Sequence, residues 1–301
     1  MKTEDRPEKN RTEEGVLYIV ATPIGNMADI SERAVKVLSE VSFVAAEDTR
    51  NSGLLLSRLG IKKPLVAYHE HNRASAGPAI VERLRAGESC ALVTDAGTPA
   101  ISDPGEELVR LCAGSGITVR PVPGCSAAVA ALSVSGLPSK RFVFEGFLPA
   151  SGTERRARLE ELAGRRLTSV IYEAPHRLRP TLSELSETCG HDRPAAVCRE
   201  LTKLNEEVLR GTLGDIAAHF AAEEPRGEFV IVLEGGDPPP SGKPAPGIRE
   251  QVEGYIASGM SEKDAIKQTA KDRGVPKNDI YSVYKLGRPD PSAKPDNNDL
   301  S

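Results

Sequence analysis

Five short segments in the first half of the chain carry residue types from which a binding or catalytic site is built. Together they supply carboxylates, imidazoles, hydroxyls and backbone amides kept accessible by glycine and proline, at residues 22–26, 46–50, 68–72, 93–105 and 123–127. Each follows a short apolar run. Because α/β sheets bind ligands at the carboxyl ends of parallel strands, the five segments predict one shared site.

The segment 93–105, VTDAGTPAISDPG, is the richest of the five. Gly97 lets backbone approach a ligand closely, while Pro99 and Pro104 stiffen the loop and reduce the ordering cost of binding. This pattern favours a ligand-binding loop over a plain connector. The segment 123–127, PGCSA, offers backbone amides at the start of a helix, where anionic groups bind.

The first segment, TPIGN at 22–26, excludes two common nucleotide folds. It lacks the G-x-G-x-x-G of dinucleotide-binding proteins and the GK[ST] of phosphate-binding loops. A strand-to-helix turn that needs a glycine at positive φ remains the simpler alternative.

Two charged segments could carry proton transfer. AEDTR at 46–50 ends a predicted strand, although Asp48 or Thr49 could equally cap the next helix. YHEHN at 68–72 places His69 and His71 on one face of an extended chain, yet no third ligand has convincing spacing. We therefore predict no metal site and expect substrate contact or proton transfer there.

The elements that position these segments follow from the hydrophobic pattern. Almost continuous apolar runs, typical of strands buried on both faces, lie at 15–21, 41–48, 64–69, 89–95 and 117–123. Amphipathic helices are expected between them at 31–40, 74–86 and 104–113. In the last, Asp103 has the position of an N-cap, Pro104 lies in the first turn, and Glu106 completes a capping box. Alternating strands and helices predict a parallel sheet.

A second strand and helix series begins after residue 138. Its strands are expected at RFVFEGF, TSVIYEA, AAVCRE, EVLRGT and FVIVLEG, and two of them follow one another without a helix. The second sheet should therefore be mixed. The fold class is α/β, with two α/β domains and a small C-terminal helical unit of helix-turn-helix type.

The predicted organisation has six parts. They are a disordered lead (1–14), an N-terminal α/β domain (15–138), a second α/β domain (139–236), a proline-rich linker (237–246), the helical unit (247–286) and a disordered tail (287–301).

Composition excludes several functional classes. With 39 Lys and Arg against 43 Asp and Glu, the chain is not a strongly basic DNA-coating protein. We expect no DNA partner, no membrane partner and a cytoplasmic location, since no apolar run could span a bilayer and the first residues are charged. The five cysteines never form CxxC, which argues against a disulfide framework or a zinc ribbon.

The motifs, taken in order, resemble those of a known family. ATPIGN, AEDTR, YHEHN, VTDAGTPAISDPG, PGCSA, FEGFLP, YEAPHR, RELTK and RGEFVIVLEG are similar to the tetrapyrrole methylase superfamily, and within it to the branch that acts on ribosomal RNA. The resemblance runs from Val16 to Gly235. Members that methylate porphyrin-type rings carry Gly-Asp-Pro where this chain has Gly97-Thr98-Pro99, so Thr98 fits the ribosomal branch.

The resemblance implies that S-adenosylmethionine binds in a folded pose between the two α/β domains, usually in a homodimer. The cofactor-binding residues carried over by position are Pro23, Ile24, Gly25, Asp95, Gly97, Thr98, Ile101, Ser126, Ala127, Tyr172, Glu200 and Leu201. It also implies a substrate, the ribose 2′-hydroxyl of one cytidine in the decoding region of 16S rRNA, within the 30S subunit.

Local charge gives modest independent support for RNA. Residues 155–179 hold seven Arg against three Glu, although a solvated helix face would look the same. The expected RNA contacts are His69, Asn72, His176, Arg177, Arg155 and Arg156. For catalysis we hypothesise Asp48 or Glu70 as the base, with Arg50 orienting the ribose and its phosphates.

Two alternatives stay open from the sequence. The chain could methylate a tetrapyrrole or another small molecule, which the Arg-rich stretch and the helical unit disfavour. It could also be a non-catalytic ribosome-assembly protein, which the intact Gly, Pro and Asp residues of the loops disfavour.

Overall fold

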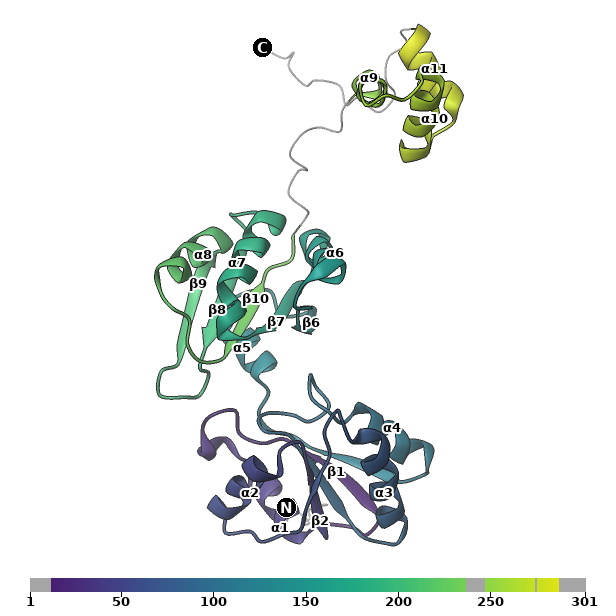
Figure 1. The fold of residues 1–301 in the computed structure, drawn as a ribbon. Helices are drawn as coiled ribbons and strands as arrows, with labels where there is room; N and C mark the ends of the chain where they lie inside the picture. Colours follow the sequence, from purple (N-terminus) through teal and green to yellow (C-terminus); the bar gives the residue numbers. More distant parts are fainter. Residues whose placement is uncertain (1–11, 237–246, 274, 287–301) are drawn as a thin grey trace, which may run out of the picture. The chain divides into compact units, whose positions relative to one another are not determined.

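The structure, a computed structural model, describes residues 12–236, 247–273 and 275–286 (Figure 1). These fall into two compact units, Met1–Pro238 and Pro239–Ser301. The predicted linker, the predicted tail and residues 1–11 of the predicted lead lie outside the described residues. Thr12 and Glu13 contact the first sheet and its helices through Glu40, Tyr18 and Arg120.

The first sheet is parallel throughout, with the strand order β3-β2-β4-β1-β5. Its strands are β1 (Val16–Val20), β2 (Phe43–Ala46), β3 (Leu65–Ala67), β4 (Cys90–Val93) and β5 (Thr118–Val122). Its helical elements are η1 (Met27–Asp29), α1 (Glu32–Glu40), α2 (Thr49–Arg58), α3 (Arg73–Arg85) and α4 (Glu106–Gly114).

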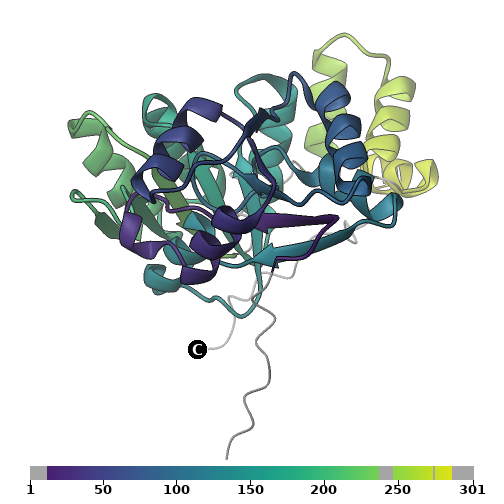
Figure 2. The same ribbon diagram turned by 90° about the horizontal axis from the view of Figure 1, so that it is seen from below.

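Helices cover both faces of this sheet (Figures 1 and 2). Along β1, Tyr18 points into the core beneath α1 and α2, while Leu17 packs with α3 and α4 on the opposite face. Because both faces are buried, the strands β1, β2 and β4 read as unbroken apolar runs, whereas the edge strand β5 includes Arg120 and is partly exposed. The sequence pattern therefore located the strands correctly.

The second sheet is mixed, with the order β6-β7-β10-β8-β9. β6 and β7 are parallel and the remaining pairs are antiparallel. The strands are β6 (Phe142–Phe147), β7 (Thr168–Glu173), β8 (Pro194–Arg199), β9 (Glu207–Thr212) and β10 (Phe229–Leu233), with helices α6 (Gly152–Gly164), α7 (Pro175–Cys189) and α8 (Leu213–Ala222). The predicted α/β class, with a parallel and a mixed sheet, is confirmed.

Helix α5 (Ala127–Ser135) joins the two sheets. Ala131 and Leu132 pack against Val170 and Val230 of the second sheet, and Ile24 from the first turn belongs to the same core. The opposite face of that sheet is covered by α6, α7 and α8. The turn after β1 and the second sheet are therefore held together by apolar packing.

The second compact unit contains three short helices, α9 (Ile248–Ala257), α10 (Glu262–Arg273) and α11 (Lys277–Leu286). They enclose a small core of their own that includes Val252, Ile266 and Ile280. No helix in the described part of the chain is long and apolar enough to cross a bilayer.

Candidate active site

A cavity of about 420 Å³ lies where loops of the first sheet meet the second sheet. Loops after β2, β4 and β5 supply one wall, and residues from β6, β7, β8 and β10 supply the other. Its lining residues are Ile24, Glu47, Thr94, Asp95, Ala96, Gly97, Thr98, Ile101, Ser102, Asp103, Ser126, Ala127, Phe147, Tyr172, Glu173, Ala174, Pro175, Cys198, Leu201, Glu228, Phe229 and Val230.

Hydrogen bonds tie the loops of the first sheet to one another. Thr22 and Gly97 exchange two backbone bonds, which join the turn after β1 to the loop after β4. The Thr98 hydroxyl donates to the Cys125 carbonyl at 2.9 Å, which adds the loop after β5. Four of the five predicted segments thus meet at the cavity, whereas the segment 68–72 supplies none of its lining residues. The hydrogen bonds between the loops hold this wall together.

The loop from Gly97 to Gly105 has an unusual backbone. Ala100 and Ser102 adopt positive φ, at 67° and 68°, and such strain in residues other than glycine is concentrated at functional sites. Gly105 has φ of 157°, and a Cβ there would lie 2.9 Å from the Ala100 Cβ. This path corrects one prediction. Helix α4 begins at Glu106 with Gly105 as its N-cap, so Asp103 lines the cavity and does not cap the helix.

The electrostatics of the cavity are acidic. No lysine or arginine appears among its lining residues, whereas Glu47, Asp95 and Asp103 do. Within the described ranges none of the three forms an ion pair. Glu47 accepts a hydrogen bond from the Thr94 hydroxyl at 2.8 Å, and Asp95 accepts one from the Asn51 amide at 2.7 Å. Burial, with Glu47 nearby, raises the pKa of Asp103 to about 6.

The wall from the second sheet is aromatic. Tyr172 packs edge-on against Phe144 and Phe147, and its hydroxyl accepts a hydrogen bond from the Ala128 amide at 3.1 Å. Burial raises the pKa of Tyr172, which keeps the hydroxyl neutral. This wall therefore presents an aromatic, uncharged patch beside the acidic loops, and its two carboxylates, Glu173 and Glu228, pair with Arg177 and Lys203.

Most of the predicted cofactor-binding residues meet at this cavity. Those that line it are Ile24, Asp95, Gly97, Thr98, Ile101, Ser126, Ala127, Tyr172 and Leu201. Pro23 and Gly25 line a neighbouring hollow of about 320 Å³, which shares Ile24 and Asp95 with the cavity. Glu200 lies outside both linings and binds Lys203 and the Glu228 amide.

The predicted catalytic residues stand apart from the cavity. Asp48 caps α2 and binds the Arg50 guanidinium at 2.7 Å, and these hydrogen bonds lower the pKa of Asp48 to about 2. The Arg50 side chain is 88% exposed. Glu70 is exposed beyond β3, the edge strand farthest from β5. None of the three lines the cavity.

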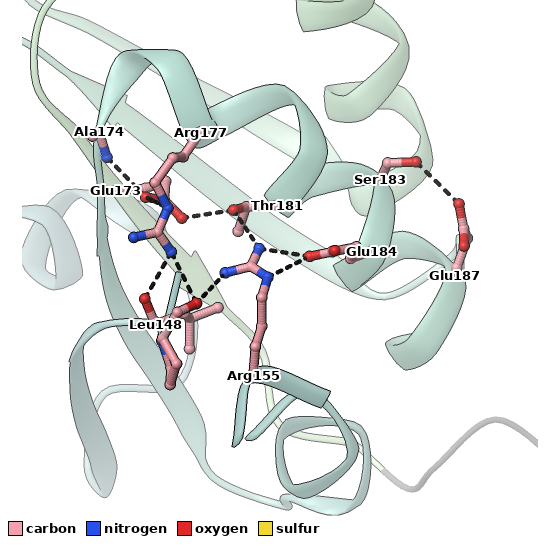
Figure 3. Close-up of polar contacts among 10 residues, drawn as sticks. Leu148, Arg155, Glu173, Ala174, Arg177, Thr181, Ser183, Glu184 and Glu187 are labelled. Carbon is pink, nitrogen blue, oxygen red and sulfur yellow. Dashed lines mark hydrogen bonds and ion pairs between the residues drawn. The ribbon is translucent and has the colours of Figure 1, made fainter. Parts of the chain in front are cut away.

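Arginines of the predicted RNA-binding stretch are largely occupied inside the protein (Figure 3). Arg155 is 7% exposed, and its guanidinium donates to Glu184, to Thr181 and to the Pro149 carbonyl. Arg177 donates to the Leu148 carbonyl and pairs with Glu173. Arg155 therefore has internal partners for its guanidinium, and contact with a phosphate would break these bonds.

The other predicted RNA contacts differ in character. Asn72 has a structural role, because its amide group accepts from the His69 backbone and donates to the Ala67 carbonyl. His176 is exposed in the first turn of α7, beside Pro175 of the cavity lining. Arg156 is exposed, and His69 packs edge-on against His71.

Sequence reasoning missed three features of the site. The sequence pattern predicts a charged strand end at Glu47 and a helix cap at Asp103, yet both side chains line the cavity. The exposed face of α2 was also missed, although the four-residue spacing of Arg50, Leu54 and Arg58 would have revealed it. Leu54 and Arg58 line the neighbouring hollow.

Neither a metal-binding cluster nor a reactive thiol is found among the described residues. No group of three or more His, Cys, Asp or Glu side chains there could hold a metal ion. The five cysteines are unpaired, and burial raises the pKa of Cys198, the one that lines the cavity, to about 11. A thiolate nucleophile is therefore disfavoured.

Comparisons with known proteins identify similar chains. Residues 16–217 match the model of the tetrapyrrole (corrin/porphyrin) methylases. The chain is 47% identical over 289 residues to the ribosomal RNA small subunit methyltransferase I of Halalkalibacterium halodurans, covering 94% of this chain and 99% of that one. It is 44% identical over 281 residues to the protein of the same name from Bacillus subtilis, covering 92% and 96%.

A solved structure shares the fold. It is the uroporphyrin-III C-methyl transferase from Thermus thermophilus complexed with S-adenyl homocysteine, with a TM-score of 0.51 and 21% identity. The match covers 72% of this chain and 96% of that one.

Proposed function

The chain belongs to the tetrapyrrole (corrin/porphyrin) methylase family, and we propose that it methylates the ribose 2′-hydroxyl of cytidine 1402 in 16S rRNA. It is an S-adenosylmethionine-dependent methyltransferase of small-subunit ribosomal RNA, like the relatives that cover nearly its whole length. The position on the ribose and the identity of the nucleotide are the proposed parts.

The chemical character of the cavity lining supports the binding of S-adenosylmethionine. The cavity combines unpaired carboxylates with an apolar aromatic wall and has no basic lining residue. A ligand that bears a sulfonium and an ammonium beside a flat adenine ring matches that surface, because carboxylates favour the cations and apolar side chains favour the ring. The residues present therefore fit S-adenosylmethionine.

Particular residues would hold each part of the cofactor. Ile24, Ile101 and Leu201 offer apolar contact for the adenosine. Asp95 would attract the cationic groups, and the first amides of α5, at Ser126 and Ala127, would suit the carboxylate. Bound S-adenosylmethionine supplies an electrophilic methyl group with a good leaving group.

The RNA is proposed to approach through the neighbouring hollow. Arg58 lines that hollow, so a basic side chain lies next to the acidic cavity, whereas Lys203 of the same lining is held by Glu200 and Glu228. Arg50, Leu54 and Arg58 share one face of α2, and guanidinium groups suit phosphates while Leu54, 62% exposed, offers apolar contact. His176 would contact the RNA from the other rim.

The protein's own part in the reaction is chiefly positioning. The cross-linked loops fix where a hydroxyl meets the methyl donor, and holding two reactants in line supplies several kcal/mol of the barrier. Tyr172 and Phe147 place aromatic side chains beside this point.

The setting of the reaction is also proposed. We infer that the 30S subunit is the substrate particle, that the enzyme is a cytoplasmic homodimer, and that the dimer lets the target strand cross both protomers.

The test is transfer of a labelled methyl group to 30S subunits, naked 16S rRNA and 50S subunits. We expect transfer to 30S, with nuclease digestion and mass spectrometry locating one 2′-O-methylcytidine at 1402. Ala127→Phe, which fills the cavity, should abolish transfer, and Ala113→Phe, at an exposed position of α4, should not. A label on 50S subunits or a small molecule, with none on 30S, would reject the proposed substrate.

A further inference from the structure

A hydroxyl that attacks a methyl group must lose its proton, so the cavity should contain a proton acceptor. Its carboxylates are Glu47, Asp95, Asp103, Glu173 and Glu228. Asp48 and Glu70, the bases suggested by the sequence, lie outside the lining.

Four of these carboxylates already have other partners. Glu173 accepts from the Ala174 amide and from the Thr181 hydroxyl at 2.6 Å (Figure 3). Glu228 is largely exposed and pairs with Lys203. Asp95 accepts from the Asn51 amide and Glu47 from the Thr94 hydroxyl. Asp103, which interacts with the Thr94 hydroxyl that already donates to Glu47, is the carboxylate most available to a ligand.

The fold places Asp103 beside Glu47 and Thr94. Parallel pairing sets Ala46 of β2 opposite Val93 of β4, so Glu47 and Thr94 follow as neighbours at the same sheet edge. The Thr94 hydroxyl donates to Glu47 at 2.8 Å and can turn its one hydrogen to the Asp103 carboxylate instead, and that hydrogen bond favours the ionised form of Asp103. The three side chains thus form a chain from Asp103 through Thr94 to Glu47.

The strained loop supports a functional role for this position. Ala100 and Ser102 adopt left-handed conformations immediately before Asp103. The Ser102 hydroxyl lies 2.8 Å from the Cβ position of Gly146, where any larger residue would collide with it. The second sheet therefore leaves room for the loop that turns Asp103 toward the cavity.

We propose that Asp103 accepts the proton of the attacking hydroxyl and that Glu47 and Thr94 tune its basicity; this rests on the proposed function. In the step, the oxygen forms a bond to the methyl carbon and its proton passes to the Asp103 carboxylate. The carbon–sulfur bond breaks, and its electron pair stays on sulfur. The products are a methyl ether, a neutral thioether and a protonated Asp103.

The surroundings of Asp103 suit this role near neutral pH. The charged or titratable groups that face it are Glu47, Asp95 and Tyr172, with Thr94 as a hydrogen-bond partner. Burial and the two carboxylates raise the pKa of Asp103 to about 6, and Thr94 opposes that rise. Above pH 6 the group is ionised and able to accept a proton, and below pH 6 it is protonated and inactive.

The test is the pH dependence of turnover at saturating cofactor and 30S subunits. The wild type should lose activity below about pH 6 with the uptake of one proton. Asp103→Asn should lower turnover at least ~100-fold and keep cofactor affinity within ~3-fold, while Asp103→Glu restores part of the rate. Asp192→Asn, an exposed position after α7, is the matched control and should behave as wild type.

Two further variants should move the acid limb of the pH profile, the loss of turnover below about pH 6, in opposite directions. Glu47→Gln removes a neighbouring negative charge, so the limb should shift to lower pH. Thr94→Val removes the hydrogen bond that lowers the pKa of Asp103, so the limb should shift to higher pH.

The proposal is overturned if Asp103→Asn keeps the wild-type rate and acid limb, or if its defect disappears when the cofactor concentration is raised. It is equally overturned if neither neighbour moves the limb. Should the wild type methylate a different hydroxyl acceptor, the RNA assignment fails, and the same profiles measured on that acceptor still decide the role of Asp103.

Discussion

The acidic cavity and the arginine-rich helices α6 and α7 differ in how far their charged side chains are paired. Around the cavity, Glu47, Asp95 and Asp103 form no ion pair among the described residues, although Glu173 of the same lining pairs with Arg177. In the helices, Arg155 and Arg177 are bound by carboxylates and carbonyls of their own domain (Figure 3). The comparison teaches that a local excess of charge indicates binding only where the folded protein leaves that charge unpaired.

The two regions also differ in what holds them in place. The cavity loops depend on backbone hydrogen bonds and on glycines with positive φ, such as Gly97 and Gly105. The helices depend on a side-chain network that joins α6, α7 and the strand end at Leu148. Substitutions should therefore impair ligand binding in the first region and stability in the second.

The largest expected effect comes from Gly105→Ala. A Cβ there would collide with Ala100 and Leu92, and φ of 157° is unfavourable for alanine. The substitution should therefore lower the free energy of unfolding by about 2–4 kcal/mol. Cofactor affinity should fall as well. The control is Gly116→Ala, which shares a positive φ but has open space, and should cost only about 1 kcal/mol. Urea denaturation measures the free energy of unfolding, and calorimetry measures the cofactor affinity. Equal losses in Gly105→Ala and Gly116→Ala would show that the loop tolerates the displacement.

Next in size is Arg155→Met, which should lower the free energy of unfolding by about 2 kcal/mol. The Pro149 carbonyl and the Thr181 hydroxyl oxygen lose the hydrogen bonds from Arg155, although Arg177 still donates to Pro149, whereas Glu184, 42% exposed, can rehydrate. Affinity for 30S subunits should not change in the folded fraction. Unchanged urea midpoints with weaker, less salt-dependent RNA binding would return Arg155 to the RNA surface and break the comparison.

A smaller effect is expected for Arg58→Ala on the exposed face of α2. Losing one phosphate contact should weaken RNA binding about 5-fold and reduce the salt slope by about 0.7–0.9, with stability unchanged. Lys62→Ala, an exposed site before β3, is the control. Filter binding at several salt concentrations gives the slopes, and identical slopes for all three proteins would remove Arg58 from the proposed interface.

The sequence predicted the architecture better than the site. Unbroken apolar runs located the strands of the first sheet, and glycine and proline located the loops that gather at its edge. The direction of Asp103 could not be predicted, because it depends on left-handed conformations at Ala100 and Ser102 that those residue types do not favour. The burial of Arg155 was equally hidden, since Thr181 and Glu184 reach it only in the folded domain.

The most direct test of the central claim is calorimetric titration of the full chain with S-adenosylmethionine. The acidic, unpaired cavity predicts binding at one site per chain, weakened at least ~10-fold by Asp95→Asn, since one carboxylate facing the cation is lost. Asp192→Asn should leave the affinity unchanged. No binding heat at any cofactor concentration, or equal affinity for wild type and Asp95→Asn, would contradict the assignment of this cavity.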